Sequence, residues 1–238
     1  MTTHFDKMLF LASDLMTNAA MNLEQARFNM IEQQIRTWDV LDTDVLQTLV
    51  DVRREEFVPL AYRNLAFFDC EIPLPCGENM LSPKFEGRIL QETAIAKHET
   101  VLEIGAGSGY LAALMAQRAR HVTTVEIEAE LCALASKNLS AYGIDNVTVV
   151  NADGALGWAS QDAAYDVIVL SGSVPVLPEA LLKQIKIGGR IFAVVGNAPI
   201  MSACLITRMA EDAWDTQTLF ESSIKPLRNV AAPSRFQF

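Results

Sequence analysis

Residues that build disulfide frameworks and metal sites are few in this 238-residue chain. Its four cysteines (Cys70, Cys76, Cys132 and Cys204) show no C-x-x-C spacing, and its three histidines are scattered along the sequence. Disulfide-rich secreted domains and zinc sites need paired or clustered cysteines. We therefore expect small, buried, reduced cysteines, a cytoplasmic protein and no metal site.

Positive charge is also in short supply. Lysine and arginine number 19 against 29 aspartates and glutamates, so the formal net charge is −10. Non-specific binding to nucleic acid needs a basic surface. We therefore expect no nucleic-acid partner.

Long apolar runs are missing as well. No run is long enough to span a membrane, and Asp14 follows closely on the short apolar stretch at residues 8–12. A secretory signal would need a longer apolar core and a basic start. We expect no membrane partner, and we interpret residues 1–21 as an N-terminal appendage or as a misassigned start before Met21. An amphipathic docking helix is the alternative.

The most informative segment that is present is 101–110, VLEIGAGSGY. It predicts a buried strand, a glycine-rich turn and a helix over residues 111–120. Glycine permits positive φ and has no Cβ to keep a ligand away from the backbone. The turn also presents free N–H groups at a helix start, which favours a polar or anionic ligand. The expected cofactor contacts in this turn are Gly105, Ala106, Gly107 and Gly109.

Two features of this turn separate a dinucleotide from S-adenosyl-L-methionine. The third glycine comes one residue too early for G-x-G-x-x-G, and the bulky Tyr110 stands at the dinucleotide position. Glu103 would repel a pyrophosphate, whereas it would attract a cofactor that carries an ammonium and a sulfonium. The pattern therefore favours S-adenosyl-L-methionine, with Glu103 in its site, over the cofactor of a nicotinamide oxidoreductase.

Carboxylates also follow the next two predicted strands. Glu126 and Ile127 end the strand at 121–127, and Asp153 and Gly154 come just after the strand at 147–150. Ligands of such sheets bind at the carboxyl ends of the strands. We expect Glu126 to accept hydrogen bonds from ribose hydroxyls and Asp153 from an adenine amino group. This array resembles the S-adenosylmethionine-dependent methyltransferases.

Apolar runs and helical patterns alternate from residue 101 onward. Such alternation predicts an α/β fold with a doubly wound, mostly parallel, Rossmann-like sheet covered on both faces. Two further strands predict an antiparallel C-terminal edge, and Gly188-Gly189 predicts a tight turn into the fifth strand. The expected strands are 101–104, 122–127, 147–150, 167–170, 191–195, 203–208 and 216–222, and the expected helices are 111–120, 128–142 and 178–185.

An N-terminal helical extension precedes this sheet. Helices are expected at 22–36, from an N-cap at Asp42 through Val52, and at 85–97, with an irregular stretch between Pro59 and Pro83. We divide the chain into the appendage 1–21, a helical and irregular region 22–84 that forms part of the active site, and a Rossmann-like S-adenosylmethionine-binding domain 85–238.

The methyl acceptor is not named by the fold. Residues 171–175 lack the Asn/Asp-Pro-Pro-Tyr motif of amino methyltransferases. Pro75-Cys76 lies upstream of the glycine turn, unlike the Pro-Cys nucleophile of cytosine-C5 enzymes, so we interpret Cys76 as structural. Other motifs match one family better; they are RREEFVP at 53–59, LAFFD at 65–69, IPL at 72–74, Gly77, VLEIGAGSGY at 101–110, DNV at 145–147, Asp153-Gly154, Gly157-Trp158, YDVIV at 165–169, LLKQ at 181–184 and GGR at 188–190.

Together these motifs, over about residues 22–208, resemble the protein-L-isoaspartate O-methyltransferases. The resemblance implies methylation of the α-carboxylate of L-isoaspartyl residues in damaged proteins, a repair reaction. It implies S-adenosyl-L-methionine as cofactor, isoaspartyl proteins or peptides as partners, and a monomer or weak homodimer. The alternatives are a methyltransferase with a different, small-molecule acceptor and a non-catalytic cofactor-binding homologue.

The chain departs from this family at one segment. The family carries Gly-Gln-Thr-Ile-Ser-Gln-Pro-Tyr, with the serine as active-site hydroxyl, where residues 77–85 read GENMLSPKF. Counting back from Gln91 aligns Ser82 with that serine, whereas counting forward from Gly77 aligns Leu81. We assign the catalytic role to Ser82, because leucine cannot hydrogen-bond a carboxylate. Lys84 or Arg88 would draw the carboxylate in, or would form a solvated helix start.

Overall fold

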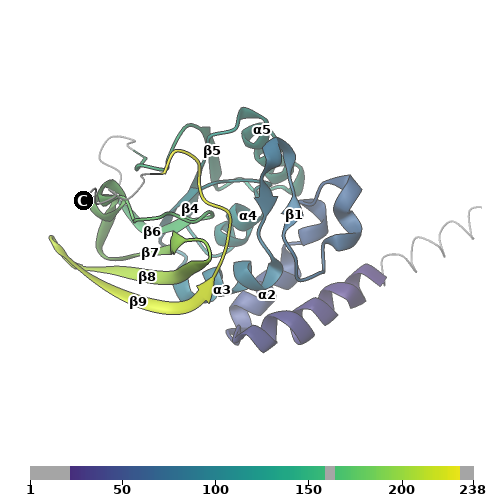
Figure 1. Cartoon of the computed structure of the whole chain (residues 1–238). Helices are drawn as coiled ribbons and strands as arrows, with labels where there is room; N and C mark the ends of the chain where they lie inside the picture. The colour runs from purple at the N-terminus through teal and green to yellow at the C-terminus, as the bar shows by residue number, and fades with distance from the viewer. Residues whose placement is uncertain (1–21, 159–163, 231–238) are drawn as a thin grey trace, which may run out of the picture.

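A seven-stranded sheet carries the fold, with helices on both of its faces (Figure 1). The structure is a computed structural model and describes residues 22–158 and 164–230, so the predicted appendage 1–21 lies outside the described residues. The sheet order is β5-β4-β3-β6-β7-β8-β9. Its strands are β3 (Thr100–Ile104), β4 (His121–Glu126), β5 (Val147–Asn151), β6 (Tyr165–Leu170), β7 (Ile185–Asn197), β8 (Ile200–Ala210) and β9 (Ala213–Ser222).

The pairing confirms the predicted fold class. β5, β4, β3, β6 and β7 are parallel to one another, and β8 and β9 add an antiparallel edge. The centre of the sheet is buried on both faces; all four residues from Val167 to Leu170 have no exposed surface. This burial explains why the sequence there is a continuous apolar run instead of an alternating one.

One predicted turn is wrong. Gly188 and Gly189 were expected to precede the fifth strand, but they lie inside β7, which begins at Ile185. The pairing of β6 with β7 is irregular between Tyr165 and Val167. Gly188 has φ +81°, and a Cβ on Gly189 would lie 2.7 Å from the Asp166 carbonyl oxygen. The glycine pair therefore forms an irregularity within a longer strand.

The helices begin within two residues of the predicted positions, but two of them end early. Asp42 caps α2 (Thr43–Asp51) by accepting from the amides of Asp44 and Val45 at 2.8 and 3.1 Å. The early ends are those of α3, at Thr93 instead of residue 97, and of α4, at Ala116 instead of residue 120. The other helices are α3 (Pro83–Thr93), α4 (Tyr110–Ala116), α5 (Ala129–Tyr142) and α6 (Glu179–Gln184).

The N-terminal region is built of short pieces. Residues 22–30 are α-helical and continue into a π-helical turn and a 3-10 turn in place of one helix to residue 36. The irregular stretch predicted before Pro83 contains 3-10 turns and a small hairpin. These pieces are η1 (Ile31–Ile35), η2 (Arg36–Trp38), η3 (Arg54–Glu56), η4 (Leu60–Leu65), β1 (Ile72–Pro73), η5 (Pro75–Gly77) and β2 (Asn79–Met80).

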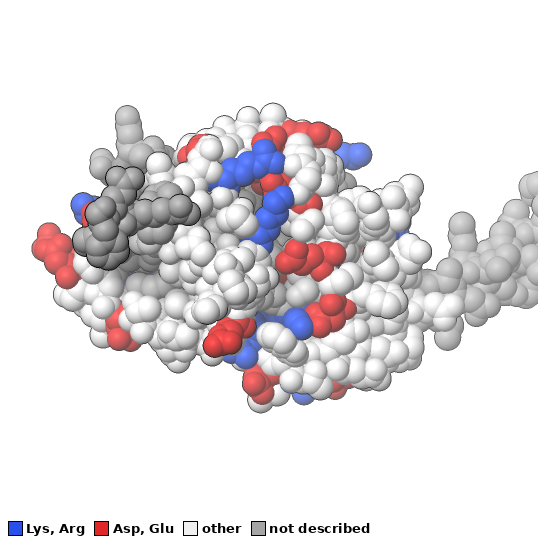
Figure 2. All heavy atoms as spheres, viewed as in Figure 1, with Lys and Arg blue, Asp and Glu red and all other residues white. Residues whose placement is uncertain are grey.

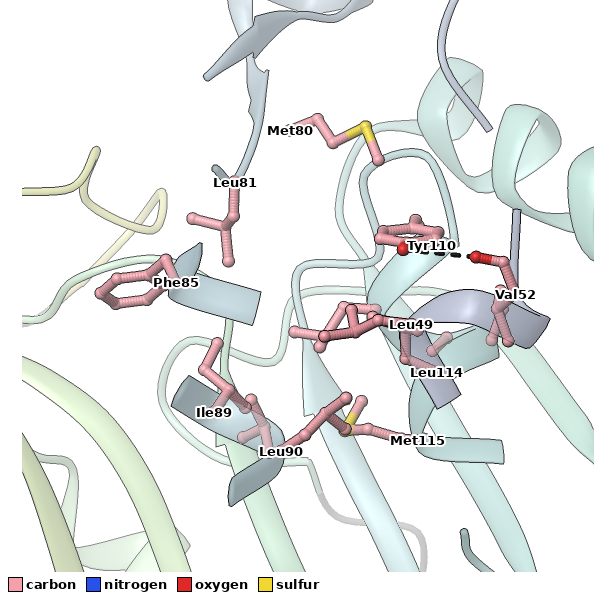
Figure 3. Packing of buried hydrophobic residues seen from close by; sticks show 14 of the residues in the cluster. Leu49, Val52, Met80, Leu81, Phe85, Ile89, Leu90, Tyr110, Leu114 and Met115 are labelled. Carbon is pink, nitrogen blue, oxygen red and sulfur yellow. Dashed lines mark hydrogen bonds between the residues drawn. The ribbon is translucent and has the colours of Figure 1, made fainter. Parts of the chain in front are cut away.

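The N-terminal region and the sheet share one apolar core. Leu49 and Val52 at α2 pack with Leu114 and Met115 of α4, and the Tyr110 hydroxyl donates to the Val52 carbonyl at 3.4 Å (Figure 3). A second cluster, with Leu181 of α6, covers the other face of the sheet. Within residues 22–158 and 164–230, no helix is both long enough and apolar enough to cross a membrane.

The cysteines are free, as expected, but they are not uniformly buried. Cys204 is buried, Cys70 and Cys132 are half-buried, and Cys76 is exposed. Cys76 has φ 59° in η5, a conformation that few residues other than glycine adopt. The expectation of four buried cysteines is therefore wrong for three of them.

A buried ion pair joins the N-terminal region to the helices of the sheet. Arg54 of η3 is 1% exposed, and its guanidinium donates to the Glu86 carboxylate of α3. It also donates to the Leu81 carbonyl at 2.6 Å and lies 5.1 Å from the centre of the Tyr110 ring. A buried charge is stable only when it is paired and hydrogen-bonded, so these contacts fix three segments around one side chain.

Replacing this arginine should destabilise the fold. Arg54→Met leaves the Glu86 carboxylate buried without its partner, so we expect the free energy of unfolding to fall by about 3 kcal/mol. Arg54→Met/Glu86→Leu should recover part of that loss. Urea denaturation of the wild type and the two variants measures both effects. A double variant less stable than Arg54→Met would contradict the expectation.

Candidate functional site

A cleft of about 750 Å³, counting the part open to solvent, lies at the carboxyl ends of the parallel strands. This is the edge where ligands bind in open α/β sheets. Its lining comprises Glu71, Glu78, Asn79, Leu81, Ile104, Gly105, Gly107, Val125, Glu126, Ile127, Glu128, Leu131, Ala152, Asp153, Gly154, Ala155, Ser171, Gly172, Lys225, Pro226, Leu227 and Arg228.

The glycine turn forms one wall of the cleft. Gly105, Gly107 and Gly109 all have positive φ, at +98°, +53° and +83°. Gly105 and Gly107 line the cleft, and Ala106 lines a smaller cavity beside it. Gly109 lines neither; a Cβ there would lie 3.2 Å from the Ala135 backbone. The structure thus gives the third glycine a packing role between α4 and α5.

Two of the predicted carboxylates reach the cleft. Glu126 is 5% exposed and accepts from the Gly107 and Glu128 amides, both at 3.0 Å. These bonds tie the end of β4 to the glycine turn. Asp153 accepts from the Ala155 amide at 3.0 Å and from the Asn229 side chain at 2.8 Å.

The residues beside these carboxylates also line the cleft. Ile127 lies next to Glu126, and Gly154 next to Asp153. A Cβ on Gly154 would approach the Ile104 side chain to 2.6 Å. A larger residue would displace the Ile104 side chain, so glycine at position 154 preserves the shape of the cleft here.

Glu103 lies beneath the glycine turn and faces the smaller cavity, of about 300 Å³. It has no exposed surface, and its two carboxylate oxygens accept from the hydroxyls of Thr124 at 2.6 Å and Ser171 at 2.9 Å. Burial raises the pKa of Glu103 to about 8, although these two hydroxyls lower it. Glu103 lines this smaller cavity and not the main cleft, so its expected place in the cofactor site stays a prediction.

Another wall of the cleft comes from a C-terminal segment, residues 224–230, which we call the strap. It follows β9 and is yellow in Figure 1. Ser173 donates from its amide to the Lys225 carbonyl, and the Leu227 amide donates to the Ser173 carbonyl, both at 2.9 Å. The Leu227 side chain lies over Gly172, where a Cβ would come within 2.8 Å of it. The strap thus closes one side of the cleft with an apolar side chain.

Ion pairs fasten the strap to the other side of the cleft. Lys225 lies 2.9 Å from the Glu78 carboxylate and donates to the Gly77 carbonyl. Arg228 lies 2.7 Å from Glu78, pairs with Glu128 and donates to the Cys76 carbonyl at 2.8 Å. In Figure 2 basic and acidic side chains lie next to one another across this face. Burial alone would raise the pKa of Glu78, but hydrogen bonds from Lys225 and Arg228 lower it below its usual value.

The sequence analysis missed the strap. Its only local signal is a pair of basic residues, Lys225 and Arg228, close together in an acidic chain. Within residues 22–158 and 164–230, no group of three or more histidines, cysteines, aspartates or glutamates could hold a metal ion. The cleft thus combines the glycine turn, the carboxylates of Glu126 and Asp153, and the two cations of the strap.

Comparison with known proteins identifies the family. A model of the protein-L-isoaspartate(D-aspartate) O-methyltransferase family matches residues 25–227 of the chain. The chain belongs to this family. The match extends beyond residue 208, where the motifs found in the sequence end, and it includes Lys225, Pro226 and Leu227 of the strap.

Relatives of the same name are similar over most of the chain. A protein-L-isoaspartate O-methyltransferase of Koribacter versatilis is 38% identical over 188 residues, which are 79% of this chain and 83% of the relative. One from Protochlamydia amoebophila is 39% identical over 184 residues, 77% and 87% of the two chains.

Solved structures agree on the fold. A Plasmodium falciparum protein described as a protein-L-isoaspartate O-methyltransferase, in complex with S-adenosyl-L-homocysteine, has a TM-score of 0.73 and 18% identity. It covers 84% of this chain and 97% of its own. A second protein-L-isoaspartate O-methyltransferase has a TM-score of 0.72 and 25% identity, and covers 84% of this chain and 65% of its own.

The segment in which this family member departs from the family motif lies beside the cleft. Leu81 lines both cavities, whereas Ser82 lines neither and stands half-buried at the N-cap of α3, without a side-chain capping bond. Pro83 is the first residue of the helix. The catalytic role of Ser82 remains a prediction, which this position does not strengthen.

The two cations predicted to attract the acceptor do not line the cleft either. Lys84 pairs with Asp69 at 2.7 Å and lies 3.9 Å from the centre of the Trp38 ring. Arg88 pairs with Glu92 at 2.7 Å and stacks on Phe220 at 4.6 Å. Both side chains are engaged by partners outside the cleft, so its basic residues come from the strap.

Glu103 should make the stability of the chain depend on pH. Its pKa is raised by burial from 4.5 to about 8. Well below 4.5 the carboxyl is protonated in both folded and unfolded chains, whereas above about 8 it is ionised in both and the folded chain alone carries the desolvation cost. The stability of the wild type relative to Glu103→Gln should therefore fall as pH rises between these limits. Urea denaturation of both proteins at several pH values measures the difference, and a constant difference would contradict the expectation.

Proposed function

We propose that the chain transfers a methyl group from S-adenosyl-L-methionine to the α-carboxylate of L-isoaspartyl residues in damaged proteins. The observation that carries the proposal is the family match over residues 25–227. The cleft supports it, because its glycine turn and its carboxylates lie where a nucleoside cofactor binds in this kind of sheet. The substrates are isoaspartyl proteins and peptides.

The residues of the cleft fit this cofactor. Gly105 and Gly107 line the cleft, and Glu126 lies at the end of β4, where we expect it to accept from the ribose hydroxyls. Asp153 is placed one strand further on, for the adenine amino group. When bound, the cofactor supplies an electrophilic methyl group on a positively charged sulfur. The S-adenosyl-L-homocysteine complex of the Plasmodium falciparum protein supports this choice.

The acceptor carboxylate is already ionised at neutral pH and needs no general base. The chain's task is to hold a carboxylate oxygen in line with the methyl group, which supplies several kcal/mol in well-oriented reactions. Leu81 and Leu227 line the cleft with apolar surface. They keep water away from the two opposite charges, and a dry site strengthens the attraction between them.

Further parts of the proposal rest on sequence reasoning. Ser82 as active-site hydroxyl, a cytoplasmic location and a monomer or weak homodimer are consistent with the family but are supported by no contact in the cleft. The same holds for the division into a region 22–84 and a domain 85–238. Buried apolar residues between Met30 and Ile95 pack with part of the sheet in one cluster, so the two proposed parts share a core.

A labelling assay tests the reaction. The chain is offered S-adenosyl-L-methionine with a labelled methyl group, together with an isoaspartyl peptide or its normal aspartyl twin. We expect base-labile label on the isoaspartyl peptide alone, because a methyl ester hydrolyses in base and an N-methyl group does not. Label on neither peptide, despite measurable cofactor binding, would rule out the proposed function.

Removing the negative charge of Glu126 tests the cofactor site. Glu126→Gln keeps the size of the side chain but removes the acceptor charge for the ribose hydroxyls. We expect the affinity for S-adenosyl-L-homocysteine to fall roughly tenfold, the loss of about one charged hydrogen bond. Titration calorimetry measures it. Glu130→Gln is the control, because it removes the same charge from an exposed residue of α5 outside the lining. Equal affinities for Glu126→Gln and wild type would exclude the ribose role.

A further inference from the structure

One wall of the cleft carries Leu81, the apolar residue that one of the two countings of this segment aligns with the family's serine. Leu81 lines the wall and offers no hydrogen bond from its side chain, while Ser82 does not line the cleft. A carboxylate that leaves water needs a replacement for its hydrogen bonds. Among the described residues that line the cleft, the cations are Lys225 and Arg228, so the partner of the acceptor carboxylate is sought on the strap.

The two cations differ in how fully they are engaged. Arg228 holds two carboxylates and a carbonyl, those of Glu78, Glu128 and Cys76. Lys225 holds the Glu78 carboxylate and the Gly77 carbonyl. An ammonium group has three donors, so one donor of Lys225 has no partner among the described residues. Its side chain is 43% exposed at the mouth of the cleft, where a peptide carboxylate would enter.

Glu78 is shared between the two cations, which makes Lys225 replaceable as its partner. Glu78 accepts from the Arg228 Nε at 2.8 Å and lies 2.9 Å from Lys225. If Lys225 turns to another carboxylate, Glu78 keeps Arg228 and is not left as an unpaired charge. Five carboxylates and two cations of the described residues line the cleft, so the positive charge of the sulfonium adds to that of Lys225 beside the acceptor.

We propose that Lys225 binds the acceptor carboxylate, with Glu78 as its resting counterion. This inference rests on the proposed function and adds to it a residue that touches the substrate. The lysine takes over the hydrogen bond that an active-site hydroxyl supplies, and the flexible ammonium follows the carboxylate to the methyl group. Lys225 therefore determines the affinity for the acceptor and not that for the cofactor.

The test compares variants of the full chain with an isoaspartyl peptide at saturating S-adenosyl-L-methionine. We expect Lys225→Met to lower kcat/KM for the peptide at least roughly tenfold, chiefly through KM, and to leave the affinity for S-adenosyl-L-homocysteine unchanged. Lys225→Arg should retain more activity than Lys225→Met. Lys186→Met is the matched control, because Lys186 is 42% exposed and pairs with one carboxylate, that of Asp166, away from the cleft.

Glu78→Gln separates substrate binding from a purely structural latch. It frees Lys225, so we expect KM for the peptide to fall or stay equal, opposite to Lys225→Met. If Lys225 only fastens the strap, both variants lower kcat/KM together and both weaken cofactor binding, which would overturn the proposal. If the wild type methylates the isoaspartyl peptide and Lys225→Met is equally active, the role of Lys225 is overturned and the proposed function stands. If Ser82→Ala alone lowers kcat/KM, that role belongs to Ser82. A wild type without this activity would overturn the proposed function as well.

Discussion

The arrangement of the cleft depends on the buried guanidinium of Arg54. It reaches the Glu86 carboxylate at the start of α3, the carbonyl of Leu81 on the cleft wall and the ring of Tyr110, the first residue after the glycine turn. Two walls of the cleft are thus held by one side chain from a region that precedes the sheet in sequence. The pairing is incomplete, since the Arg54 Nε has no partner among the described residues. Burying a charge in this way is costly, which is consistent with a contact that fixes geometry more than it adds stability.

The sheet could be predicted from the sequence because its signal is local. Parallel strands buried on both faces need largely apolar runs; residues 167–170 form a continuous one, and 101–104 and 122–127 are rich in β-branched and apolar residues. The helix ends could not be predicted in the same way. Ala94 adopts φ 43° after α3, and the Arg190 side chain donates to the carbonyls of Thr93 and Ala94. A contact from β7 therefore terminates this helix, and no pattern near residue 94 contains that information.

The candidate site, too, could be predicted from the sequence only in part. Glu126 and Asp153 follow strands whose ends meet at one edge of the sheet, so their position in the cleft was accessible from spacing alone. Spacing did not decide between Leu81 and Ser82, because two countings of the segment disagree. The structure places Leu81 on the wall and Pro83 at the first turn of α3. The strap was inaccessible for a further reason, since its ion pairs join residues that no local pattern connects.

The strap has a consequence for how the site is assembled. The hydrogen bonds of its Lys225 and Arg228 side chains link residues 100 to 152 positions apart in sequence. Closing such long loops is slow compared with forming local contacts, and a chain emerging from the ribosome folds from its N-terminus. The glycine turn and its strands can form before residues 225–228 are available, but the cleft still lacks a wall and both of its cations at that stage. A nascent or truncated chain would therefore have the glycine turn of the cofactor site but no cation to bind an acceptor. The chain becomes competent for the reaction only when the fold is complete.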